Sequence, residues 1–171
     1  DTLQSLQTIA HGGDSVQYFQ WRKSRGSLEK FHGAVVDHVG TNETRIFKTI
    51  SETGRRLKTI DEIAGTFVNA RVALMYDWEN MWALDDAQGF ANAGKKYYET
   101  CYEYHRFFWE RGIDCDIVSA KADLSGYKLV IAPMLYLTDE KTAKNLRCYV
   151  ENGGTLYGTY MLGTVNEDDL C

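Results

Sequence analysis

Glu29 and His32 are the residues whose types and spacing are best suited to chemistry in this sequence. A carboxylate and an imidazole three residues apart can hydrogen-bond the hydroxyl groups of a ligand, or the carboxylate can take part in acid–base catalysis. The same spacing also describes an ordinary solvent-exposed pair on one helical turn. The nearby rings of Tyr18, Trp21 and Phe31 favour a partly buried site, where an unpaired carboxylate would be costly.

A second pair of carboxylates, Asp77 and Glu79, flanks Trp78 directly after an apolar stretch. Doubly wound sheets bind ligands at the carboxyl ends of their strands, and glycosidases use two carboxyl groups about 5–10 Å apart. Residues two apart fall within that range, but so do many surface pairs, so the spacing does not favour catalysis here. Trp78 and Trp82 are more typical of residues that anchor a partner surface.

Sequence motifs for nucleotides, flavins and covalent nucleophiles are missing: there is no G-x-G-x-x-G, no G-x-x-x-x-G-K-[ST] and no G-x-S-x-G. No cofactor is therefore expected. The four cysteines, at positions 101, 115, 148 and 171, lack the spacing of a zinc site, so no metal is expected either. Their place in or beside apolar segments favours a reduced, cytoplasmic protein.

The charge pattern argues against nucleic acid as a partner, because the net charge is −5 and the basic cluster Arg22-Lys23-Ser24-Arg25 is short. That cluster is more typical of a solvated loop. No apolar run approaches the roughly 20 residues that a membrane-spanning helix needs, so no membrane partner is expected.

The elements that must position Glu29 and His32 lie in the first 65 residues. Helical spacing predicts a helix over residues 3–10, followed by a buried strand over residues 15–21 whose carboxyl end carries the loop. Asn42 can cap a further helix. A strand that presents a carboxylate and an imidazole at its carboxyl end is typical of a (β/α) barrel, and too little sequence precedes it for a whole barrel.

From residue 66 onward the pattern changes to four apolar strands alternating with helices. We predict strands at 71–76, 113–118, 127–132 and 155–159, an aromatic helix over 95–110 after a polar connection, and a helix capped by Thr138. This order favours an α/β domain with a doubly wound, parallel, flavodoxin-like sheet of strand order 2-1-3-4. The aromatic helix is apolar on more than one face, which indicates contact with another subunit or domain.

With these residues in view, the sequence resembles the β-galactosidases of glycoside hydrolase family 42. The similarity spans nearly the whole chain, and its first two runs are the most specific. The matching runs are Gln7-Thr8-Ile9-Ala10-His11-Gly12, Tyr18-Phe19-Gln20-Trp21-Arg22, Gly26 with Glu29-Lys30-Phe31-His32, Asp77-Trp78-Glu79, Asp123-Leu124-Ser125-Gly126-Tyr127-Lys128, Ala132-Pro133 and Gly153-Gly154.

The resemblance implies an enzyme fragment that hydrolyses terminal β-D-galactosides with retention. Residues 1–65 would be the C-terminal remnant of the (β/α)8 catalytic barrel, including its last strand and helix. Residues 66–171 would be the trimerisation domain of a homotrimer, glutamine amidotransferase-like in fold, with truncation at its C-terminus left open. The competing hypothesis is a free-standing, non-catalytic α/β oligomerisation or interaction domain.

For the site, the resemblance implies that Glu29 and His32 bind the hydroxyl groups of the β-galactoside substrate. Both catalytic glutamates would lie upstream of Asp1, so this chain would carry no catalytic residue and be inactive alone. If Glu29 were itself the nucleophile, a partner carboxylate about 5.5 Å away would be required, and the chain offers none at a comparable strand end.

Overall fold

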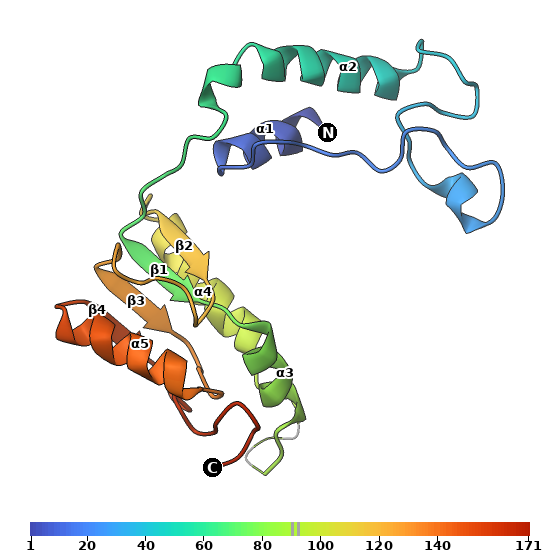
Figure 1. Cartoon of the computed structure of the whole chain (residues 1–171). Coiled ribbons are helices and arrows are strands. Elements are labelled where there is room, and N and C mark those ends of the chain that lie inside the picture. Colours follow the sequence, from blue (N-terminus) through green and yellow to red (C-terminus); the bar gives the residue numbers. More distant parts are fainter. Residues whose placement is uncertain (90, 92) are drawn as a thin grey trace. The chain divides into compact units, whose positions relative to one another are not determined.

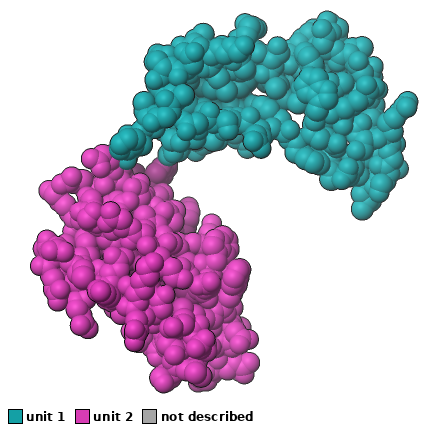
Figure 2. Space-filling model, in the orientation of Figure 1, with its two compact units in different colours: residues 1–68 teal, residues 69–171 magenta. Residues whose placement is uncertain are grey.

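The chain divides into two compact units, residues 1–68 and 69–171 (Figures 1 and 2). The computed structural model describes residues 1–89, 91 and 93–171. The polar connection predicted before the aromatic helix includes residues 90 and 92, which lie outside the described residues. None of the helices in the described ranges is both long and apolar enough to cross a membrane.

The first unit is built on two helices, α1 (Thr2–Ala10) and α2 (Arg45–Lys58), with short 3-10 turns η1 (Leu28–Phe31) and η2 (Asp61–Ile63). A hydrogen bond between two hydroxyl groups joins the helices. Thr53 donates to the carbonyl of Thr49 at 2.8 Å, so its oxygen accepts the proton of Thr2 at 2.8 Å. Thr44, rather than the predicted Asn42, caps α2 by accepting a hydrogen bond from the Phe47 N–H at 3.3 Å.

The buried strand predicted over residues 15–21 is wrong. The segment is irregular, and two of its apolar side chains, Phe19 and Trp21, are 74% and 67% exposed. A strand needs a neighbour to satisfy its backbone groups. Among the described residues, this region makes only the isolated parallel bridge between Arg22 and Val36.

The second unit is a four-stranded parallel sheet in the order β2-β1-β3-β4, as predicted. The strands fall inside the predicted ranges; the two central ones are mostly buried, whereas the two edge strands stay partly exposed. The register pairs Val72 with Cys115 on one side and with Leu129 on the other. The bounds are β1 Val72–Met75, β2 Cys115–Val118, β3 Leu129–Ala132 and β4 Thr155–Gly158, with helices α3 Trp78–Asp86, α4 Tyr97–Trp109 and α5 Glu140–Glu151.

Helices cover both faces of this sheet, as its doubly wound class requires (Figure 1). Alternate residues of β1 point to opposite faces. Leu74 packs in a cluster with Leu84 of α3 and Cys101 of α4. Its neighbour Met75 belongs to a second cluster that contains Leu146 of α5. All four residues of β1 are therefore buried.

The carboxyl edge of the sheet is closed by side-chain hydrogen bonds to the backbone. Asn80 of α3 is 1% exposed; its amide nitrogen donates to the Met134 carbonyl and its amide oxygen accepts from the Leu137 N–H, both at 2.9 Å. The Met134 N–H donates to the Thr159 hydroxyl at 2.7 Å. These bonds fix the segment after β3 against α3.

The caps of α3 and α5 differ from the sequence-based expectation. Residues 77–79 follow the carboxyl end of β1, as expected, but the helix that begins there, α3, was not predicted. Asp77 caps α3 by accepting from the Asn80 N–H at 3.1 Å. Asp139, rather than the predicted Thr138, caps α5 by accepting from the Thr142 N–H at 2.6 Å.

Candidate functional site

The loop that carries Glu29 and His32 is closed by backbone hydrogen bonds between its two ends. The Val35 N–H donates to Gln20 at 2.9 Å, the Val36 N–H donates to Trp21 at 2.7 Å, and the Lys23 N–H donates to Val36 at 3.0 Å. Val35 is 8% exposed, so the returning end of the loop is anchored in the unit. We call residues 20–38 the Glu29 loop.

Glu29 and His32 lie together in one tight turn, the arrangement that the sequence left open for a solvent-exposed pair at this spacing. Glu29 belongs to η1, and the His32 N–H donates to the Glu29 carbonyl at 3.0 Å. The Glu29 carboxylate accepts a hydrogen bond from the Ser24 hydroxyl at 3.1 Å. The imidazole of His32 meets the Phe19 ring edge-on, with ring centroids 6.2 Å apart and an interplanar angle of 64°.

The returning end of the loop holds Ser24 in place. His38 Nε2 lies 2.9 Å from the Ser24 carbonyl and, when protonated, donates to it. The Lys23 ammonium pairs with Asp37 at 3.4 Å. The hydrogen bond from the His38 backbone N–H, supported by Lys23, lowers the pKa of Asp37. Asp37 therefore stays ionised and keeps the two ends of the loop attached.

The predicted crowding around Glu29 is wrong, because the structure leaves Glu29 and His32 exposed. Phe31 is 76% exposed, and its ring contacts the Lys30 ammonium, 5.0 Å from the centroid. Chemically, the loop presents a carboxylate that accepts hydrogen bonds and an imidazole that can donate or accept them. Exposed aromatic faces beside them can pack against the apolar face of a ligand.

Asp77 and Glu79 are not arranged as a catalytic pair. The Asp77 carboxylate caps α3, and Glu79 lies 3.7 Å from the Lys121 ammonium. Trp78 and Trp82 are 59% and 60% exposed on α3. Within the described residues, His, Cys, Asp and Glu side chains form no group that could hold a metal ion.

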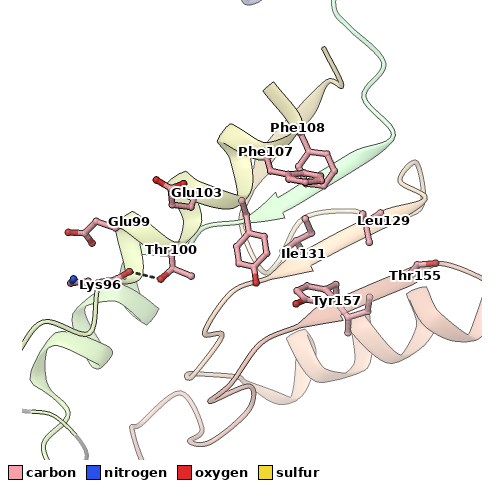
Figure 3. A pocket seen from close by; sticks show the side chains of 12 residues that line it. Lys96, Glu99, Thr100, Glu103, Phe107, Phe108, Leu129, Ile131, Thr155 and Tyr157 are labelled. Atoms are coloured by element: carbon pink, nitrogen blue, oxygen red, sulfur yellow. Dashed lines mark hydrogen bonds between the residues drawn. The ribbon is translucent and has the colours of Figure 1, made fainter. Parts of the chain in front are cut away.

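An apolar groove in the second unit was missed by sequence reasoning, which predicted only a surplus of apolar surface on the aromatic helix. Figure 3 shows α4 on one side of this groove and β3 and β4 on the other. Its volume is about 850 Å³. We call it the α4 groove; its apolar lining is Tyr104, Phe107, Phe108, Leu129, Ile131, Leu156 and Tyr157.

Comparisons with known proteins match both units, in order. Residues 1–60 match the family model described as "Beta-galactosidase", and residues 70–171 match the one described as "Beta-galactosidase trimerisation domain". β-Galactosidase GalA of Bacillus licheniformis is 54% identical over 98% of this chain and 25% of its own length. β-Galactosidase Pbg of Clostridium perfringens is 52% identical over 99% of this chain and 24% of its own length.

Solved structures agree with the sequence comparisons. Gan42B, a GH42 β-galactosidase from G. stearothermophilus, is 55% identical, with a TM-score of 0.92 over 99% of this chain and 25% of its own. The β-galactosidase of Rahnella sp. R3 is 52% identical, with a TM-score of 0.91 over the same shares. The chain thus spans about a quarter of the length of these relatives.

Both units match parts of a single class of glycoside hydrolase. The chain belongs to the β-galactosidases of glycoside hydrolase family 42. The family resemblance and the α/β fold class with a parallel sheet, both predicted from the sequence, are confirmed.

Proposed function

We propose that this chain is part of a longer, retaining β-galactosidase that hydrolyses terminal β-D-galactosides. Residues 1–65 form the last portion of its catalytic barrel, and residues 66–171 belong to the domain that joins three subunits. The observation that carries this proposal is the match of both family models, in order, over nearly the whole chain. The location is the cytoplasm, in keeping with four cysteines that are all free.

The role of the first unit is to hold Glu29 and His32 against the galactoside. Glu29 accepts hydrogen bonds from sugar hydroxyls, and His32 donates or accepts another. The site is open in the described residues, because both side chains are exposed while Val35 anchors the returning end of the loop. The acid/base and nucleophile glutamates come from sequence upstream of Asp1, so this chain binds substrate without performing the chemistry.

The test is substitution of Glu29 by Gln, and of His32 by Ala, in the full-length enzyme. A hydrogen bond to a charged group contributes about 1.5–3 kcal/mol, so kcat/KM should fall roughly 10- to 100-fold with Glu29→Gln. Glu43→Gln is the matched control, because Glu43 is exposed and pairs with Lys48 at 2.6 Å outside the loop. Unchanged kcat/KM in both loop variants would exclude the substrate-binding role.

The length of the natural gene product tests the proposal as a whole. A denatured mass several times the 19.5 kDa of this chain supports a fragment of a longer enzyme. A natural product near that mass would instead support the free-standing interaction domain. Mass spectrometry of the purified natural protein decides between them.

A further inference from the structure

The α4 groove is an apolar surface between α4 and the strands β3 and β4. In Figure 3, Phe107 and Phe108 of α4, Ile131 of β3 and Tyr157 of β4 border the space between helix and strands. Tyr104 and Tyr157 meet across it, with ring centroids 5.9 Å apart. Phe107 and Tyr157 remain 49% and 51% exposed. An apolar surface of this kind usually marks a contact site.

The same two strands are covered on their other face. Val130 and Ala132 of β3 are 0% exposed and pack in a cluster with Leu146 and Tyr149 of α5. On the groove face, by contrast, α4 packs on β1 and β2. Parallel strands are normally buried on both faces. The β3–β4 half of the sheet therefore lacks its second layer on the α4 side.

The handedness of the chain restricts what can supply this layer. The crossovers β1–α4–β2 and β3–α5–β4 run in opposite directions along the sheet. Right-handed crossovers in opposite directions place their helices on opposite faces, as observed here. A further right-handed crossover from β4 outward would put its helix beside α5. The cover must therefore be a helix that returns after the last strand, or another molecule.

The chain beyond β4 already returns toward the α4 side. Val165 bridges Leu137 and is 5% exposed. It belongs to the cluster that contains Leu74 and Tyr97, on the face that α4 covers. The width of the uncovered area also matches one helix. Neighbouring helices pack about 8–10 Å apart, which is about twice the 4.8 Å that separates adjacent strands. One helix beside α4 would cover both β3 and β4.

We propose that the α4 groove receives an amphipathic helix of the same polypeptide, from the part of the enzyme that follows residue 171. This inference depends on the proposal above that the chain is part of a longer β-galactosidase. The apolar stripe of the helix packs on Phe107, Ile131 and Tyr157.

A photo-crosslinking amino acid at position 157 tests the occupant in the full-length enzyme. Tyr157→p-benzoylphenylalanine should give a crosslink within one chain, to a peptide located after residue 171. A crosslinked dimer would mean that a second copy fills the groove, and a crosslink only to residues 1–171, or none, would mean that no such helix does. Tyr98, which is 60% exposed on α4 and outside the groove, is the control position and should not give the same product.

A charge placed in the groove gives an independent readout. Phe107→Glu should lower the midpoint of thermal unfolding by roughly 5 °C or more, because it places a charge against the buried helix. Trp109→Glu is the control, since Trp109 is 62% exposed and does not line the groove. The mass of the assembled oligomer, and hence the number of subunits, should stay the same. Equal effects of the two substitutions, or loss of subunit assembly with Phe107→Glu alone, would overturn the proposal.

The mass of the natural gene product separates failure of this inference from failure of the proposed function. A denatured mass near 19.5 kDa would contradict the longer enzyme itself.

Discussion

Ser24 connects the backbone of the Glu29 loop to the carboxylate that we propose binds substrate. Its hydroxyl lies 3.1 Å from Glu29 Oε2 and 3.4 Å from Gln20 Oε1. A hydroxyl has one proton, and the carboxylate is both the nearer and the charged acceptor. Ser24 therefore donates to Glu29, and His38 holds the Ser24 carbonyl at 2.9 Å. A segment that the sequence described only as a basic, solvated loop thus orients Glu29.

Ser24→Ala in the full-length enzyme should raise KM roughly 2- to 10-fold, because a typical hydrogen bond contributes about 0.5–1.5 kcal/mol. The kcat value should change less, since the role proposed for the loop is to bind substrate and not to perform the chemistry. Ser24→Thr should restore KM, and Ser51→Ala, an exposed serine on α2, is the control. A normal KM in Ser24→Ala, together with a defect in Glu29→Gln, would show that Glu29 needs no support from Ser24.

Cys101 makes the stability of the second unit sensitive to alkaline pH. Burial raises the pKa of its thiol from 9.0 to about 11. Above pH 9 the unfolded chain loses this proton while the folded chain retains it, so stability is lost between pH 9 and about 11. Unfolding by urea at pH 7.5 and pH 10.5 should show a smaller loss of free energy in Cys101→Ala than in the unchanged protein. Equal losses would exclude Cys101 as a cause.

The packing of the Tyr149 ring against Gly154 leaves no room for a side chain between α5 and β4. A Cβ atom there would lie 2.3 Å from the ring of Tyr149, which is 7% exposed and donates to the Thr155 carbonyl at 3.2 Å. Gly154→Ala should therefore reduce the free energy of unfolding by about 1–3 kcal/mol. Gly126→Ala, where a Cβ would meet nothing within 4 Å, should be nearly neutral. Urea unfolding of both variants would measure the difference, and equal stabilities would contradict the predicted clash.

The sequence predicted the elements that are buried within their own unit and failed where tertiary context decides. The four strands of the sheet and their order were predictable, because the central runs Val72–Met75 and Leu129–Ala132 are apolar and mostly buried, and helices alternate with the strands. Helix α3 was missed, because its sequence has little amphipathic pattern and Asp77 was considered as one of a carboxylate pair rather than as a helix cap. The stretch 15–21 is as apolar as a strand, but among the described residues only its end, at Gln20 and Trp21, accepts backbone hydrogen bonds from another segment, at Val35 and Val36.

The proximity of Glu29 and His32 was predictable from spacing, since residues three apart share one turn. Their surroundings were not, because aromatic residues in a sequence indicate burial without showing what covers them. The α4 groove could not be predicted from the sequence either. Its two sides, Phe107 on α4 and Tyr157 on β4, are 50 residues apart in the sequence, and only the sheet brings them together.

For the whole molecule, the proposed homotrimer requires an apolar contact surface between subunits. Trp78 and Trp82 are four residues apart and share one face of α3. Trp82→Glu should weaken subunit association roughly 30-fold or more, because buried aromatic anchors contribute about 2 kcal/mol or more. Native mass spectrometry of the full-length enzyme over a dilution series measures this. Trp109→Glu is the control, and a Trp82→Glu enzyme that stays trimeric at every dilution would exclude α3 from the interface.

The hydrogen bonds of Asn80 have a consequence for how such a sheet can change its role. In doubly wound proteins, free backbone groups beyond the strand ends are what a phosphate or a nucleotide recognises. Here the side chains of Asn80 and Thr159 hydrogen-bond the backbone groups of Met134 and Leu137. These backbone groups are therefore not free to bind a ligand. Binding a small molecule at this edge would first require breaking bonds that fix α3. The hydrogen bonds that close this edge therefore favour a fixed arrangement of α3 and the segment after β3 over the binding of a small molecule.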